Sequence, residues 1–578
     1  MSVNSRASFR VPYHCLTSAP RFLSFAIAAM FGLLLGATSD LRTVRGADVA
    51  VPEDERLRVH GIAGTLVLSG AERPDATTLE TFVALAGRRN ARILYLVIDD
   101  RPTPADADLP ADAAQTRATL LDRWLAVGGQ QWLVARQTAG GPVTEELLAA
   151  LASATGVWCD GTSVDGLRAW LADERVAAAL TRIRANGGIV GGSARLVRAT
   201  LSNSAAVAAN IPADKQNDSA NGAALSWLPG LTVEIAALDQ PSPTLSRQLA
   251  DTPLIVGLQI EPTTTLIVRE REIRSIAAGD AAVHFATRAG RFDPGHRLST
   301  RNRVADITAL RRAAVDLQRD AYPPKEVPKP VVEKGTLVIV GGGGTPQGLM
   351  ERFVTLAGGK EASIVVLPIS MPDPLPPRDG AAEAFRRLGA KEVHVLNGRT
   401  PSEVNQPDVL EKLDRATGVW FGGGRQWRFV DAYESTPALE KLRGVLARDG
   451  VIGGSSAGAT IQGDYLVRGH PLGPHIMMAE GYERSFAFLR GVGIDQHFTQ
   501  RRRQPDMLSF MERYPQFLGI GLDETTAIVV RGSTAEVVGK FQAHFFDARE
   551  PQPDGKPRVV SLGEGAKFDL AERKTIAP

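Results

Sequence analysis

A serine within a run of small residues is the first place in this chain where chemistry could occur. The pentapeptide Gly454-Ser455-Ser456-Ala457-Gly458 fits the G-x-S-x-G nucleophile elbow. Small residues on both sides of the serine let the backbone turn sharply from a strand into a helix, and this turn exposes the hydroxyl. The N–H of Ala457 would then point to the place where an oxyanion forms. The motif is short and also fits a plain turn after a buried strand, so it needs support from the rest of the chain.

A serine hydroxyl becomes a good nucleophile when a base takes its proton and an acid orients that base. Two polar segments after the elbow, residues 493–503 and 518–527, supply both groups. We predict that Ser456 is the nucleophile, His497 the base and Glu524 the acid. The chain order Ser, His, acid disfavours the α/β-hydrolase fold, whose order is Ser, acid, His.

Other side chains could take the same roles. The rivals to the predicted base are His470 and His475, which flank a proline-rich turn close to the elbow. The rivals to the predicted acid are Asp464 and Asp523. Asp523 is adjacent to Glu524, so on a strand its side chain would point to the other face.

Composition limits the classes of protein to consider. A chain of 578 residues is too long for one core and predicts two or more domains. Its 44% hydrophobic and 22% charged residues are typical of a globular protein, and the net charge of +2 gives no case for nucleic acid. The sequence shows no Cys/His pattern of a metal site, and the predicted chemistry needs neither a metal nor an organic cofactor.

The first residues indicate export. Three arginines precede an apolar stretch at 22–36, which small residues follow, as in a signal peptide. We predict a signal peptide and leader over residues 1–47 and a secreted or periplasmic protein. The alternative is an uncleaved N-terminal segment that tethers the protein to a membrane. Cys15 would leave with the signal, and Cys159 alone cannot form an intrachain disulfide.

Short motifs recur in the same order in two parts of the chain, which predicts a duplicated domain. Trp158 and Trp420 are as far apart as Thr263 and Thr525. The recurring motifs are 64–67 and 335–338 (Gly-Thr-Leu-Val), 82–87 and 353–358, 154–158 and 416–420 (Ala-Thr-Gly-Val-Trp), 188–193 and 450–455, and 228–230 and 489–491. We predict a first domain over 57–320, a proline-rich linker over 321–334 and a second domain over 335–578.

Within each copy, short apolar runs alternate with amphipathic segments, and this pattern predicts a mostly parallel sheet covered by helices on both faces. Functional sites of such sheets lie beyond the carboxyl ends of the strands. In the second copy we predict strands at 335–340, 363–368, 392–396, 418–421 and 451–454, and helices at 347–356 and 437–448. The glycine turn at 341–344 lacks the spacing of a nucleotide-binding loop, so we interpret it as a close approach of two chain segments.

Four ordered motifs of the second copy resemble the cyanophycinase branch of the S51 serine peptidases, a family that also contains aspartyl dipeptidases. They are Gly422-Gly-Gly-Arg-Gln426, Ser456-Ala-Gly-Ala459, Asp495-Gln-His-Phe498 with the following arginines, and Gly519-Ile-Gly-Leu-Asp-Glu524 with Thr526-Ala527. The resemblance covers about residues 334–546. It implies two tandem class I glutamine-amidotransferase-like α/β domains and a Ser-His-Glu triad. It also implies oxyanion donors at Gly423 or Gly424 and Ala457, and substrate-binding side chains at Gln426, Asp495, Gln496, Arg501 and Arg503. The family pattern continues with a further arginine where this chain has Asp506.

The first copy lacks the predicted catalytic groups. In the repeat alignment, Ala194, Ala236 and Pro262 take the places of the serine, histidine and glutamate. We therefore predict that the first copy is a degenerate pseudoenzyme domain. Since S51 relatives often pair through the catalytic domain, the first copy could occupy that partner surface and form a pseudo-dimer within one chain.

The resemblance implies a serine peptidase that cuts peptide or isopeptide bonds next to aspartyl residues, with cyanophycin-like β-Asp-Arg units or small Asp peptides as substrates. Two alternatives remain: a non-catalytic binding or scaffold protein, and an esterase that uses the same serine.

Overall fold

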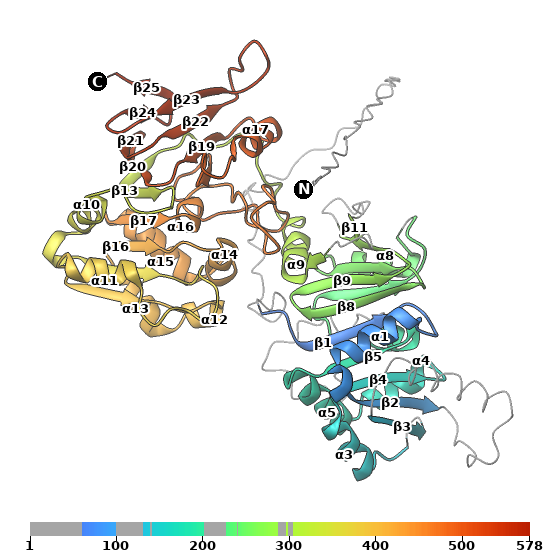
Figure 1. Cartoon of the computed structure of the whole chain (residues 1–578). Helices are drawn as coiled ribbons and strands as arrows, with labels where there is room; N and C mark the ends of the chain where they lie inside the picture. The colour runs from blue at the N-terminus through green and yellow to red at the C-terminus, as the bar shows by residue number, and fades with distance from the viewer. Residues whose placement is uncertain are drawn as a thin grey trace, which may run out of the picture. The chain divides into compact units, whose positions relative to one another are not determined.

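The computed structural model describes residues 60–99, 131–138, 141–201, 227–239, 241–286, 296–298 and 304–577 (Figure 1). The predicted signal peptide at 1–47 and Cys15 lie outside these residues. No helix in the described part of the chain is long and apolar enough to span a membrane.

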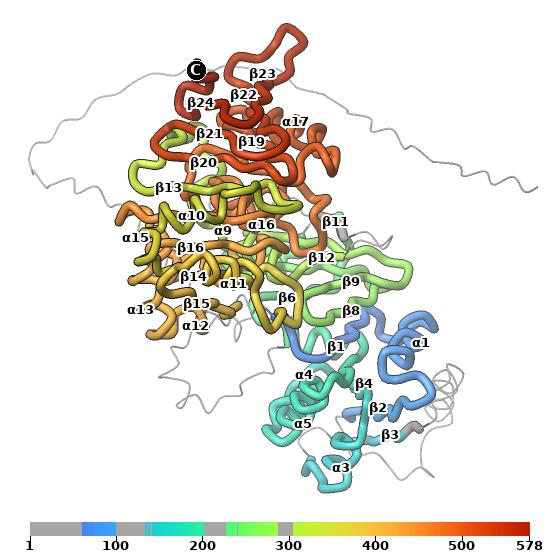
Figure 2. The backbone as a smooth tube through the Cα atoms, turned by 60° about the vertical axis from the view of Figure 1, so that its left-hand side comes forward, coloured from blue at the N-terminus to red at the C-terminus, as the bar shows by residue number. Residues whose placement is uncertain are grey.

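The second half of the chain is built on a large mixed sheet. Its order in the described residues is β15 (Glu392–Val395), β14 (Ser363–Leu367), β16 (Gly418–Phe421), β17 (Val451–Ser455), β13 (Val332–Val340), β20 (Thr526–Gly532), β21 (Thr534–Gly539), β24 (Lys567–Asp569) and β25 (Lys574–Ile576). Figure 2 shows the labelled strands of this sheet in that order, from β15 at the bottom to β24 at the top. All five strands predicted for this half are present.

The predicted mostly parallel sheet is only half right. The strands from β15 to β13 pair in parallel, whereas β20 pairs antiparallel with both β13 and β21, and the pairs from β21 to β25 are also antiparallel. The tight connection between β20 and β21 at Ser533 allows only an antiparallel pair, because parallel strands need a long crossover.

Helices cover both faces of this sheet, as predicted. Alternate residues of β13 point to opposite sides, since the side-chain period of a strand is two. Val338 and Val340 pack with α10 (Leu349–Leu356) and α11 (Gly380–Arg387). Leu337 and Ile339 belong to the core of the opposite face, with α13 (Pro407–Arg415), α14 (Trp427–Tyr433) and α15 (Pro437–Ala447).

The predicted helices begin and end close to the expected residues, as α10 and α15, and local capping fixes the start of α15. The Thr436 hydroxyl accepts a hydrogen bond from the Leu439 amide, and Pro437 occupies the first turn of α15. Proline is well suited to that position, where its missing N–H would have had no helical partner.

A second, smaller sheet follows in the same half. It consists of β18 (Val492–Gln496), β19 (Leu518–Leu522), β22 (Ala543–Asp547) and β23 (Arg558–Leu562), in that order. The sequence analysis identified none of these as a separate sheet. Its first two strands are parallel and end at the same edge, so the residues after Gln496 and Leu522 come together there.

The first half has a corresponding arrangement in the residues that the structure describes. The large sheet runs β12 (Val304–Asp306), β9 (Glu272–Ala277), β8 (Thr264–Glu270), β1 (Ile62–Ser69), β5 (Ile189–Gly192), β4 (Gly156–Gly161), β2 (Arg92–Asp99) and β3 (Gln131–Thr138). The small sheet runs β11 (His296–Leu298), β10 (Ala281–His284), β7 (Val256–Ile260) and β6 (Leu231–Ile235). In both large sheets, four parallel strand pairs are followed by antiparallel pairs.

The predicted linker is only partly a connection. Helix α9 (Ile307–Asp316) precedes it, and β13 already begins at Val332 inside the predicted linker. The Tyr322 hydroxyl donates to the Asp464 carbonyl at 2.9 Å, and its ring stacks on Tyr465. The connection is therefore held against the second half. The domain boundaries themselves stay a prediction.

Candidate active site

Ser456 lies at a strained turn between a strand and a helix. Strand β17 ends at Ser455, and α16 (Ala457–Thr460) begins directly after Ser456, whose backbone has φ 57° and ψ −111°. A positive φ is costly for a residue with a side chain, and such strain often occurs at functional sites. The flanking glycines are required by space: a Cβ on Gly454 would lie 2.4 Å from the Gly458 carbonyl oxygen. The local sequence therefore produces the elbow that its small residues predict.

His497 lies next to the serine. It follows the last residue of β18, has φ 51°, and donates its backbone N–H to the Gly341 carbonyl at 2.8 Å. The Ser456 Oγ is 2.9 Å from Nε2 of His497, and Nδ1 of the same ring is 2.6 Å from Oε1 of Glu524. Because Nδ1 donates to the carboxylate, Nε2 is free to accept the serine proton. The structure thus brings the three predicted residues together in one hydrogen-bonded chain.

The glycine turn after β13 explains how the histidine and the glutamate fit there. A Cβ on Gly342 would lie 2.4 Å from Cε1 of His497, and one on Gly343 would lie 2.5 Å from Oε2 of Glu524. The predicted close approach at this turn is confirmed. The turn approaches the imidazole of His497 and the carboxylate of Glu524, a contact that the sequence analysis did not identify. The run of four glycines at a strand end was the sequence signal for this contact.

The surroundings favour the neutral form of the histidine. Burial lowers the pKa of His497, because a charged imidazolium loses its hydration there. The hydrogen bond to Glu524 acts in the opposite direction, and the positive charge of Arg501 lowers the pKa further. The net direction is downward, so the ring is unprotonated and able to act as a base at neutral pH.

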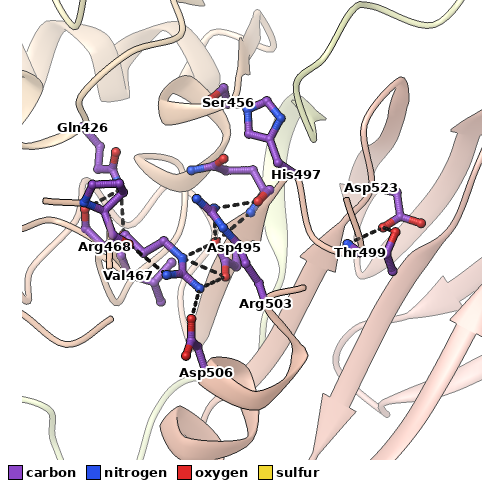
Figure 3. Close-up of polar contacts among 12 residues, drawn as sticks. Gln426, Ser456, Val467, Arg468, Asp495, His497, Thr499, Arg503, Asp506 and Asp523 are labelled. Atoms are coloured by element: carbon purple, nitrogen blue, oxygen red, sulfur yellow. Dashed lines mark hydrogen bonds and ion pairs between the residues drawn. The ribbon is translucent and has the colours of Figure 1, made fainter. Parts of the chain in front are cut away.

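The rival side chains have other partners. Asp523 accepts hydrogen bonds from the backbone and hydroxyl of Thr499. Figure 3 shows this pair apart from Ser456 and His497. Asp464 accepts from Tyr322 and from the Gly491 amide. The His470 ring accepts from the Leu472 amide within its own turn.

The rival His475 also belongs to that turn, since a Cβ on Gly473 would lie 2.3 Å from Cε1 of its ring. The histidine that hydrogen-bonds Ser456 is His497.

Two of the predicted substrate-binding residues are held in a buried ionic cluster. Asp495 is fully buried and accepts from Arg468 at 3.0 Å and from Arg503 at 2.8 Å. Arg468 also donates to Asp506 at 2.7 Å (Figure 3). The cluster contains two guanidinium groups and two carboxylates, so its charges balance. The charge of Asp495 is directed to Arg468 and Arg503, and that of Arg503 is directed to Asp495. Arg468 was not identified from the sequence, and the signal that pointed toward it was the unusual Asp506.

The other predicted residues differ in burial: Gln426 and Gln496 are buried, and Arg501 is at the surface. Gln426 is buried, and its Nε2 donates to the carbonyls of Val467 and Arg468. Oε1 of Gln496 is buried without a hydrogen-bond partner in the described part of the protein. Arg501 is exposed. A buried acceptor without a partner is costly, so the Gln496 amide is suited to a ligand donor.

The predicted oxyanion donors are not equivalent. A Cβ on Gly423 would lie 3.4 Å from Cβ of Ser456, so this glycine lies beside the serine. Gly424 instead faces Ser370, whose carbonyl oxygen would be 2.2 Å from an added Cβ. The Ser370 hydroxyl donates to the Gly422 and Gly423 carbonyls at 3.1 and 2.9 Å and fixes this loop. Ala457 is the first residue of α16, where an N–H has no intrahelical partner.

No group of three or more His, Cys, Asp or Glu side chains placed to hold a metal ion occurs among the described residues. The α/β fold and the arrangement of a serine, a histidine and a glutamate are those of a serine-type hydrolase.

Comparison with known proteins defines the family. The model of peptidase family S51 matches residues 337–538. The chain is 30% identical over 250 residues to a cyanophycinase from Geminocystis herdmanii, which covers 40% of this chain and 89% of that protein. It is also 30% identical over 250 residues to a cyanophycinase from Synechococcus elongatus, at 42% and 74% coverage. A solved peptidase structure from an acI-B1 actinobacterium matches at 21% identity and a TM-score of 0.32, over 42% of this chain and 98% of that chain. The chain belongs to peptidase family S51.

Proposed function

We propose that this chain is an exported serine peptidase that hydrolyses peptide or isopeptide bonds next to aspartyl residues. The observation that carries the proposal is the continuous chain of hydrogen bonds from Ser456 through His497 to Glu524, at a strained elbow within a family S51 domain. The apolar stretch near the N-terminus supports export.

The reaction proceeds through an acyl-enzyme. Ser456 Oγ attacks the substrate carbonyl carbon while its proton moves to Nε2 of His497, and Glu524 stabilises the resulting imidazolium. The C–N bond breaks as His497 returns the proton to the leaving amine. Water then attacks the ester with His497 again as the base, and its proton returns to Ser456 Oγ as the acid product leaves.

Backbone amides stabilise the oxyanion of both tetrahedral intermediates. Ala457 supplies one donor, and Gly423 is the better placed of the two predicted glycines because it lies beside Ser456. Gly424 contributes by its φ of 145°, which lets the loop pass close to the Ser370 carbonyl. Ser370 holds this loop in place.

The substrate class follows from the relatives and from the side chains at the site. The curated relatives are named cyanophycinases, which favours β-linked Asp-Arg units, with small Asp peptides as the other members of the class. Arg501 binds a substrate carboxylate, and Gln496 accepts a hydrogen bond from a substrate N–H. Gln426, Asp495 and Arg503 act as positioning residues, since their polar atoms hold the walls of the site.

The first half is proposed to be a degenerate copy of the second that acts as an internal partner and forms a pseudo-dimer within one chain. Arg271 of the first half donates to Asp431 at 2.6 Å and to the Tyr482 hydroxyl at 2.7 Å. Arg312 pairs with Glu434. Asp431 lies on α14, which directly follows the loop that contains Gly423, so these contacts support the wall of the site.

Replacement of the serine tests the proposal. Ser456→Ala is expected to lower kcat for a β-Asp-Arg dipeptide by about 10⁵-fold, because no other group can form the acyl-enzyme. Ser455→Ala is the matched control, since it removes a neighbouring hydroxyl that is not bonded to His497. Hydrolysis is measured with the full-length protein, as the release of free arginine from the dipeptide.

Equal activity of Ser456→Ala and wild type would disprove the nucleophile assignment. Wild-type activity on simple acyl esters but on no amide would favour an esterase instead. Binding of the dipeptide without turnover would favour a non-catalytic binding protein.

A further inference from the structure

A charged cavity of about 550 Å³ lies between residues of the first half and residues of the second half. The first half contributes the turn from β8 to β9 around Glu270 and Glu272. The second half contributes Arg399, Trp427 and Arg428. None of these side chains takes part in the proposed reaction at Ser456.

The inner end of the cavity is held by ion pairs around Arg271. The side chain of Arg271 is 11% exposed and bonds to Asp306 at 2.9 Å and Asp431 at 2.6 Å. Its guanidinium also lies 4.5 Å from the centroid of the Trp427 ring. These contacts satisfy the buried charges, so the cavity floor is a fixed surface and its outer groups remain for a ligand.

The second half contributes two guanidinium groups that lie close together. Arg399 and Arg428 both donate to the Met371 carbonyl, and both lie near the carboxylate of Asp373. Burial and the neighbouring charge of Arg399 lower the pKa of Arg428, and Arg271 and Arg425 act in the same direction. An anion placed here would relieve this repulsion.

The opposite edge has exposed carboxylates. Glu270 is solvent-exposed, and the side chain of Glu272 is 53% exposed with Arg274 no closer than 3.8 Å. Arg269 lies on the same edge. The cavity is thus lined by both carboxylates and guanidinium groups, which matches a ligand that carries both charges.

The second-half residues that line the cavity lie next to residues of the proposed active site in the chain. The segment that contains Met371 and Asp373 follows Ser370, which holds the Gly422–Gly423 backbone next to the serine. Trp427 directly follows Gln426. Residues of the cavity lining are therefore direct chain neighbours of residues at the proposed active site.

We infer that this cavity is a second binding site, which takes further units of a peptide chain that carries alternating carboxylate and guanidinium groups. The inference rests on the proposed function for the substrate class but not for the residues involved. Substrate carboxylates lie against Arg428 and Arg399, and substrate guanidinium groups lie against Glu270 and Glu272. Long substrates would then bind more tightly than a single dipeptide unit.

Binding measured without turnover tests the site. Full-length Ser456→Ala protein is titrated calorimetrically with a β-Asp-Arg peptide of about ten units and with the single dipeptide. Adding Arg428→Gln or Glu272→Gln is expected to weaken binding of the long peptide about three- to fivefold each, the upper part of the range for exposed charge pairs. Dipeptide affinity is expected to stay within about twofold, since it does not reach the cavity. Arg415→Gln, an exposed arginine of α13 outside the cavity, is the control.

An unchanged affinity for the long peptide in both variants, or an equal loss for both lengths, would overturn the cavity site. So would an oligo-aspartate of the same length that binds as tightly and responds in the same way, because it lacks the positive groups. Should Arg428→Gln fail to fold, Glu272→Gln still decides the test, since its side chain is exposed.

Wild-type turnover separates the two proposals. Dipeptide hydrolysis with no cavity effect on the long peptide would refute only the second site. Cavity-dependent binding without any hydrolysis would refute only the proposed peptidase activity.

Discussion

The two halves of this chain reach the same point of their large sheets with different backbones. In the second half, Ser456 stands outside the helix with φ 57°, and its N–H donates to the Val340 carbonyl. In the first half, Ala194 is already the first residue of α6 (Ala194–Thr200), and its N–H donates to the Ala71 carbonyl. Both segments read Gly-Gly-Ser, and from this sequence alone one shared turn would be expected. Among the described residues, the elbow forms in the second half and not at this position of the first half.

The histidine differs in the same way. The pairing of β6 with β7 matches that of β18 with β19 up to Ile235 and Gln496. The next backbone bond, from the Ala236 N–H to the Ile260 carbonyl, corresponds to the bond from the Phe498 N–H to the Leu522 carbonyl. Ala236 is therefore the counterpart of Phe498, not of His497 as the alignment predicted. His497 is an extra residue, pushed out of the strand with φ 51°.

The glycine turn completes the comparison. The Gly70 N–H donates to the Thr264 carbonyl as the Gly341 N–H does to Thr526, which fixes the alignment. Ala71 and Glu72 then stand where the second half has Gly342 and Gly343. Glu72 pairs with Arg195 and Arg198, so this region of the first half is an ion-paired surface.

The difference teaches that the proposed site depends on three backbone departures as much as on three polar side chains. A serine, a histidine and a glutamate placed on the first-half backbone would not meet. Each departure costs on the order of 1–3 kcal/mol where φ is positive on a residue other than glycine. The second half retains this strain at Ser456 and His497.

Among the tests of this comparison, the largest effect is expected from copying one first-half residue into the second half. Gly342→Ala is expected to lower kcat/KM for a β-Asp-Arg dipeptide by about 100-fold, because the new methyl group displaces the imidazole and a shift of 1 Å has that effect. Gly348→Ala is the matched control: its φ of 75° is also positive, but an added Cβ has nothing within 4 Å. An equal loss in both variants would show that strain alone, not contact with His497, lowers activity.

A smaller effect tests the elbow itself through stability. Ser456→Gly is expected to be more stable than Ser456→Ala by about 1 kcal/mol, because glycine accepts the positive φ. At Ala194 the sign reverses, and glycine is expected to cost about 1 kcal/mol in the helix. Urea unfolding of the full chain gives both differences. The same sign at both positions would contradict the backbone difference described here.

Much of the second half was predictable because local chemistry decides it. The apolar runs became β13, β14 and β16, and the three residues predicted from types that serve one reaction lie within hydrogen-bond distance of one another. The family assignment was also correct. These predictions needed only periodicity and motifs.

The rest depended on contacts between distant segments. The smaller sheet was missed because β18 and β19 pair only after α17 (Gln504–Arg513) crosses between them. Arg468 gave no local signal, since its role comes from Asp495 and Asp506. The sequence analysis identified His497 but not that it is an insertion relative to the first half, because a one-residue insertion leaves the recurring motifs unchanged. The register of a strand pair is set by hydrogen bonds between the strands, and these cannot be read from the sequence.

The smallest expected effect is a shift in the pKa of His497, which tests the charge around the histidine separately from its geometry. The first half has no counterpart of this histidine for comparison. Arg501 lowers the pKa of His497, so Arg501→Gln is expected to raise that pKa. The base must be neutral to act, and activity is lost as pH falls through its pKa. The acidic limb of kcat/KM against pH therefore moves to higher pH in the variant. Added salt screens the exposed Arg501 and shifts wild type in the same direction.

Arg502→Gln is the control for this shift, because Arg502 is also exposed but is not among the leading charges that act on His497. A rise in KM without movement of the limb would mean that Arg501 serves substrate binding alone. A limb that moves to lower pH would contradict the electrostatic role, since removal of a nearby positive charge cannot make an imidazolium less stable.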